Sequence, residues 1–71
     1  MTEQLMLKVG DVIELREKYQ HGYSIGTVIK INEFYHGGQY GWFSRDIVVL
    51  CNNGMIIRIT ESCIQNIIAS D

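Results

Sequence analysis

Asn53 and Gly54 lie between two short runs of apolar, mostly β-branched residues, 46–51 and 55–59. Such runs favour β-strands, and an Asn-Gly pair favours the two-residue type I′ turn of a β-hairpin, in which both residues have a positive φ. In the register of that hairpin, one face carries Val48, Leu50, Ile57 and Ile59, and we expect this face in the core. The other face carries Val49, Cys51, Ile56 and Arg58. It is more apolar than a solvent-exposed face needs to be, so we expect it to be partly covered or to form a contact surface.

The whole chain reads as an all-β domain of five short strands. Runs of β-branched residues bounded by turn residues predict strands at 11–16, 26–32, 46–51, 55–59 and near 64–68. Residues 60–63, TESC, predict one 3₁₀ turn before the last strand, with the Thr60 hydroxyl as its cap. We expect one freestanding domain over residues 1–71, with residues 1–8 as a flexible or edge segment.

Five of the seven aromatic residues lie between Glu33 and Asp46. Gly37 and Gly38 within this segment predict a second two-residue turn, at the tip of a protruding hairpin. This turn sets His36 opposite Gln39 and Tyr35 opposite Tyr40, where paired rings would stabilise the hairpin. Combining this register with that of the Asn-Gly hairpin requires a β-bulge, which we expect near Gly41 or Ser44.

The rings of this segment divide by their expected roles. Phe34 and Phe43 have no polar group, and we assign them to the core or to the base of the hairpin. Trp42 has the weakest structural role, and exposed Tyr and Trp side chains dominate the energetics of protein interfaces. Two accounts stay open and are compatible: the rings only support the hairpin, or Tyr35, Tyr40 and Trp42 form a recognition patch.

The segments VGDVIEL and GYSIGTVIKI resemble the opening strands of SH3-like small β-barrels of the KOW and Tudor-like kind. The matching residues are Gly10, Asp11, Gly26, Val28 and Ile31. The segment DIVVLCNNGMIIRITESCIQNI resembles the later half of these barrels, with its NG turn and closing strand. The resemblance implies a five-stranded barrel in which the long first loop lies beside the aromatic hairpin. Tyr19, Tyr23, Tyr40 and Trp42 would then share one surface, flanked by the charged residues Glu17, Lys18 and Arg45.

Composition and motifs exclude several classes of function. A formal net charge of −2 argues against binding mainly through nucleic-acid phosphates, although KOW domains bind nucleic acid. His21, His36, Cys51 and Cys63 include no closely spaced pair of metal ligands, and neither cysteine lies in a catalytic motif. No glycine-rich phosphate loop and no apolar run of about 18 residues occurs. We therefore expect no catalysis, metal or cofactor, no membrane contact, and two free thiols in a reducing cytoplasm.

The sequence favours a small cytoplasmic binding module that contacts a partner protein. The expected contact residues are Tyr19, Tyr23, Tyr35, Tyr40, Trp42 and Arg45. Small freestanding barrels of this kind resemble regulators or inhibitors that bacteriophages and mobile elements encode. Two alternatives stay open: KOW-type binding of RNA or single-stranded DNA, and a structural subunit that self-associates through Val49, Cys51 and Ile56.

Overall fold

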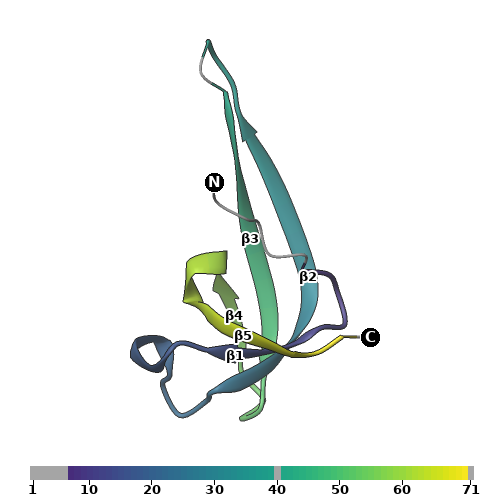
Figure 1. Cartoon of the computed structure of the whole chain (residues 1–71), viewed down its shortest axis with the longest axis vertical. Coiled ribbons are helices and arrows are strands. Elements are labelled where there is room, and N and C mark those ends of the chain that lie inside the picture. The colour runs from purple at the N-terminus through teal and green to yellow at the C-terminus, as the bar shows by residue number, and fades with distance from the viewer. Residues whose placement is uncertain (1–6, 40, 71) are drawn as a thin grey trace.

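Five antiparallel strands form one sheet in the order β4-β3-β2-β1-β5 (Figure 1). The computed structural model describes residues 7–39 and 41–70. Along the chain, the elements are β1 (Val12–Leu15), the 3₁₀ turn η1 (Glu17–Tyr19), β2 (Ile25–His36), β3 (Trp42–Cys51), β4 (Ile56–Ile59), the 3₁₀ turn η2 (Glu61–Cys63) and β5 (Ile64–Ala69). The prediction of an all-β chain with five strands and a 3₁₀ turn before the last strand is confirmed. Within the described ranges, no helix has the length and apolar character needed to cross a membrane.

The sheet coils strongly, because β4 and β5 follow one another in the chain yet form its opposite edges. Five flat strands would place the two edges about 19 Å apart, at about 4.8 Å per strand. The link from Ile59 to Ile64 reaches about 17 Å even when fully extended, and η2 shortens it. The edges must therefore curl toward each other, although no ladder pairs β4 with β5 in the described part of the chain.

The core lies on the concave side of this coiled sheet. Its buried apolar side chains come from every strand except β4: Ile13, Leu15, Val28, Ile47, Val49, Cys51 and Ile64. Leu7 joins them, so the N-terminal segment is anchored at that residue, and the rest of the expected flexible segment, residues 1–6, lies outside the described residues. Gly26 allows the close approach of β2 and β3, because a Cβ at this position would collide with Cγ1 of Val49.

The β3–β4 turn differs from the predicted two-residue turn by one residue. Gly54 has a φ of 89°, but no non-glycine residue in the described ranges has a positive φ, so Asn53 does not adopt the type I′ conformation. The Gly54 N–H donates to the Cys51 carbonyl oxygen at 2.9 Å, and the Cys51 N–H donates to the Met55 carbonyl oxygen at 2.7 Å. These bonds define a three-residue loop that ends in a left-handed glycine, which is the next most common hairpin connection.

The extra loop residue changes which face of β3 lies in the core. Leu50 now pairs with Ile56 and Val49 with Ile57, one position away from the predicted register. Because side chains alternate between faces, a shift of one residue moves every side chain of β3 to the other side, whereas Ile57 and Ile59 of β4 pack against the core as predicted. Val49 and Cys51 are therefore buried and Leu50 is 42% exposed, while Ile56, predicted on the outer face, is 63% exposed. The predicted self-association face of Val49, Cys51 and Ile56 is wrong, since two of its three residues lie in the core.

A β-bulge at Ile29 joins the core part of the β2–β3 hairpin to its outer part. Val28 pairs with Val49 and Lys30 with Val48, which leaves Ile29 as an extra residue in β2. The predicted bulge near Gly41 or Ser44 is wrong in position, because no register shift occurs there. Beyond the bulge, β2 and β3 extend past the ends of their neighbours (Figure 1). We call this extension, residues 32–36 and 42–46, the hairpin arm.

Candidate functional site

The face of the arm that continues the core side carries a pair of rings. Tyr35 lies opposite Phe43, with ring centroids 4.9 Å apart and planes tilted by 49°. The Tyr35 ring extends over Gly41, where a Cβ would overlap the tyrosine hydroxyl group. The predicted pairing of Tyr35 with Tyr40 is therefore wrong, and Tyr40 itself lies outside the described residues. The turn between the two strands spans five residues, 37–41, rather than two.

The opposite face of the arm carries a second stack. His36 lies opposite Trp42, not opposite Gln39, with ring centroids 3.8 Å apart and nearly parallel planes at 15°. Nε2 of His36 shares a hydrogen bond of 2.9 Å with the Ser44 hydroxyl, which fixes the ring over the strand. Phe34 lies next to Ser44 on the same face. Each face of the arm is thus covered by rings that pack in pairs across the two strands.

These rings are exposed to solvent. Phe34, Trp42, Tyr35 and Phe43 are 46%, 57%, 60% and 69% exposed. The assignment of Phe34 and Phe43 to the core or the hairpin base is wrong, because the arm extends beyond the layer that could bury them. Phe43 is a candidate contact residue that the sequence reasoning missed. A longer turn between the two strands would have placed Phe43 opposite Tyr35, on the same exposed face of the arm.

Arg45 makes two ion pairs, one within the arm and one that links the arm to η2. Its Nε lies 3.2 Å from Oε1 of Glu33, and its second guanidinium nitrogen, NH1, donates to Oε1 of Glu61 at 3.0 Å. The side chains of Arg45 and Glu61 are each 26% exposed, so this pair is better shielded from solvent than a surface pair. Arg45, predicted as a flanking charge, therefore connects the arm to the coiled sheet.

A hollow of about 320 Å³ lies beside this ion pair. It is lined by Phe43, Ser44, Arg45, Thr60, Glu61 and Ser62. The Thr60 hydroxyl does not cap η2, as the sequence had suggested, but hydrogen-bonds the Ser62 hydroxyl at 2.8 Å. The hollow therefore offers a ring, the hydroxyl groups of Thr60 and Ser62 and an ion pair to a ligand, whereas the Ser44 hydroxyl bonds His36 on the opposite face of the arm.

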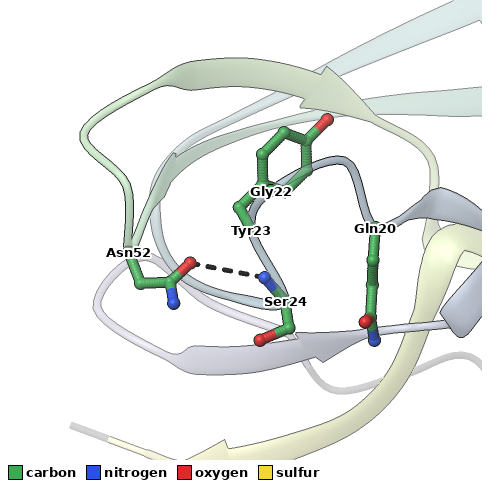
Figure 2. Close-up of a pocket in the computed structure, with 5 residues that line it drawn as sticks. All are labelled: Gln20, Gly22, Tyr23, Ser24 and Asn52. Carbon is green, nitrogen blue, oxygen red and sulfur yellow. Dashed lines mark hydrogen bonds between the residues drawn. The ribbon is translucent and has the colours of Figure 1, made fainter.

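A second hollow, of about 350 Å³, lies between the first loop and the β3–β4 turn. Figure 2 shows Gln20, Tyr23, Ser24 and Asn52 around it, with the Ser24 N–H donating to Oδ1 of Asn52 at 3.3 Å. The Tyr23 ring packs against the core, and the Gln20 amide donates to the Leu15 carbonyl oxygen at 2.9 Å. These contacts tie the loop to the sheet, which gives the residues a structural role.

The first loop and the arm do not form one surface. η1 and the loop that follows it lie at one end of the molecule, and the tip of the arm lies at the other, along a longest dimension of 42 Å (Figure 1). Tyr19 is half-buried, with the Lys18 ammonium group 5.1 Å from its ring centroid. The structure therefore places Tyr35, Trp42 and Arg45 on the arm, with Trp42 on the face opposite to Tyr35 and Arg45, and separates them from Tyr19 and Tyr23.

Three ionisable groups outside the arm, Asp11, Cys51 and Cys63, have structural roles. Asp11 is fully buried, and its Oδ2 accepts the Lys8 N–H at 3.0 Å, which closes the turn before β1. Cys51 and Cys63 are free thiols, as the sequence indicates, and burial raises the pKa of the Cys51 thiol. In the described part of the chain, no group of three or more metal-ligating side chains is close enough together to hold an ion.

Comparison of the chain with protein-family models, curated proteins and solved structures finds no match.

Proposed function

We propose that this chain is a non-catalytic binding module whose hairpin arm contacts a partner protein. The observation that carries the proposal is the set of four exposed rings on a two-stranded arm that extends past the core. A two-stranded hairpin is marginally stable on its own, and contiguous exposed apolar surface marks interaction sites. Tyr, Trp and Phe held in stacked pairs offer a large contact area with little conformational entropy to lose on binding.

An SH3-like barrel is the fold that we propose for the module. The strand order, the long first loop, the strong coiling of the sheet and the 3₁₀ turn before β5 all support it. In this proposal the barrel is a rigid base and the arm is its working part. The role that fits such a compact unit is a small cytoplasmic regulator or inhibitor of another protein. The free thiols are compatible with a reducing compartment.

Affinity capture with matched variants tests this function. The immobilised chain is compared with Trp42→Ala plus Phe43→Ala, which removes one ring from each face of the arm. Met55→Ala is the control, because Met55 is 52% exposed in the β3–β4 turn, away from the arm. We expect the double variant to lose a captured protein that the wild type and the control both retain. If all three capture the same set, the arm is not the contact site.

Nucleic-acid binding is the second candidate, and the exposed stack of Trp42 on His36 is the observation that favours it. A base stacked on such a ring contributes about 1–3 kcal/mol. The neighbouring carboxylates of Glu33 and Asp46 oppose it, because they repel phosphates. Titration with mixed single-stranded oligonucleotides at low salt decides between the two. Tight, salt-sensitive binding that Trp42→Ala abolishes would replace protein binding with nucleic-acid binding.

A further inference from the structure

Within residues 7–39 and 41–70, the outer edge of β3 has no paired strand along the arm. β4 covers β3 only up to the pair Ile47–Ile59, after which the chain turns into η2. In the described part of the chain, no strand pairs with residues 42–46 of β3 on the side away from β2. Alternate residues of a strand direct their N–H and C=O groups away from the paired neighbour. This stretch therefore presents main-chain groups that a further strand could bind.

The hollow beside Arg45 lies where a longer β4 would have run. If β4 continued in its present register, its next three residues would lie opposite Asp46, Arg45 and Ser44. Instead, residues 60–62 move away into η2, and they line one side of the hollow while residues 43–45 line the other. The hollow therefore lies between β3 and η2, where a continued β4 would have paired with β3. Peptides commonly bind such exposed edges by adding a strand to the sheet.

The charge of this gap favours a cation. Two carboxylates, Glu33 and Glu61, contact the single guanidinium of Arg45, so the cluster has a formal charge of −1. The ring of Phe43, 69% exposed, lines the same hollow, and aromatic faces attract ammonium and guanidinium groups. A basic side chain in the hollow would meet both the ring and the excess negative charge.

We propose that an extended peptide segment of the partner, with one lysine or arginine, pairs with the open edge of β3 and places that basic side chain between Phe43 and Glu61. The proposal, which rests on the proposed function, gives the partner a chemistry: a basic, strand-forming segment. The main chain of β3 supplies affinity along residues 42–46, and the hollow selects the basic residue. The exposed rings of the arm contact the same segment or the surface beside it.

Selection of random linear peptides against the immobilised chain tests the proposal. We expect the enriched peptides to share one basic residue flanked by β-branched residues at alternate positions. Glu61→Gln should weaken the binding of an enriched peptide about tenfold, which is the loss of one charge-assisted contact. Asp46→Asn is the matched control: it also removes a carboxylate from this part of the chain, but that carboxylate pairs with Arg58 on the other face. We expect its affinity to stay within about twofold of the wild type.

Amide resonances locate the peptide independently of the variants. We expect the enriched peptide to shift and protect amides at residues 42–46 and 60–62, and not those at residues 17–24. Enrichment without a basic residue, equal affinities for Glu61→Gln and Asp46→Asn, or protection confined to the first loop would each overturn the proposal. A stable dimer of the free chain with the β3 edge already protected would overturn it as well, because a second copy would then occupy the edge. If the proposal fails while the Trp42→Ala plus Phe43→Ala variant still loses its captured protein, the proposed function survives it.

Discussion

Replacement of Gly26 by alanine tests how closely β2 and β3 approach in the core. A Cβ at this position would collide with Cγ1 of Val49 and would lie 3.0 Å from the Leu50 carbonyl oxygen and 3.4 Å from Cα of Cys51. Two of these three neighbours are backbone atoms, which cannot move without separating the strands. Overpacking of this kind costs about 1–3 kcal/mol. The lower chain entropy of alanine in the unfolded state offsets about 0.4–1 kcal/mol of that cost.

We therefore expect Gly26→Ala to lower the free energy of unfolding by about 1.5 kcal/mol, or the melting temperature by about 6–12 °C for a domain of this size. Urea titration followed by circular dichroism measures the first quantity, and a thermal scan measures the second. Gly37→Ala is the control. Its Cβ would meet the Tyr35 ring at 3.6 Å, an ordinary contact, and its φ is not positive. We expect this control to stay within about 0.5 kcal/mol of the wild type.

A double-mutant cycle shows whether the collision with Val49 is the cause. Val49→Ala alone should cost about 2 kcal/mol by loss of buried methyl groups. Combined with Gly26→Ala, it removes the colliding methyl, so we expect the double variant to be about 1 kcal/mol more stable than the sum of the two losses predicts. The result that refutes the reasoning is additivity within about 0.5 kcal/mol, or a Gly26→Ala variant as stable as the wild type.

Three further predictions concern the thiol, the ion pairs and the rings. Because burial raises the pKa of the Cys51 thiol, the folded state holds that proton more tightly than the unfolded state does. The free energy of unfolding should therefore fall as the pH rises above about 8.5. Cys51→Ala should reduce this pH dependence in urea titrations. Arg45→Gln should cost about 0.5–1 kcal/mol at low salt and less at high salt, and an unchanged urea midpoint would contradict a role in holding the arm. Tyr35→Ala and Phe43→Ala should couple by about 0.5–1 kcal/mol in a double-mutant cycle, whereas Trp42→Ala and Phe43→Ala, on opposite faces, should be additive.

The sequence predicts the strands better than it predicts how they pair. Runs of β-branched residues locate all five strands and the 3₁₀ turn before β5, because side-chain shape and turn residues act locally. The Asn-Gly pair is compatible with a two-residue and a three-residue loop, which differ by one position in register. The choice depends on contacts distant in sequence, including the Asn52 N–H, which donates to the Ile25 carbonyl oxygen at 2.8 Å. A local rule does not include such a bond.

The candidate site also has features that local sequence predicts and features that depend on distant contacts. Exposure of Tyr35 and Trp42 could be predicted, because a hairpin with rings on both strands cannot bury them all. The length of the turn could not be predicted, because the Gly37-Gly38 pair also fits within a five-residue loop. The position of Phe43 depends on that length, so it could not be predicted either. The contact of Arg45 with Glu61 joins residues far apart in the chain, and it exists only because the sheet coils.

Because of the single extra residue at Ile29, the direction of the arm can change without a change in the side chains on each of its faces. Bulges bend and twist a strand locally, so this one sets the direction of the arm relative to the core. Deleting Ile29 would leave Val28 opposite Val49 and Lys30 opposite Val48, and every ring would keep its face. Evolution can therefore re-aim the arm through the loss or gain of one codon, while the chemistry that the arm offers to a partner stays the same.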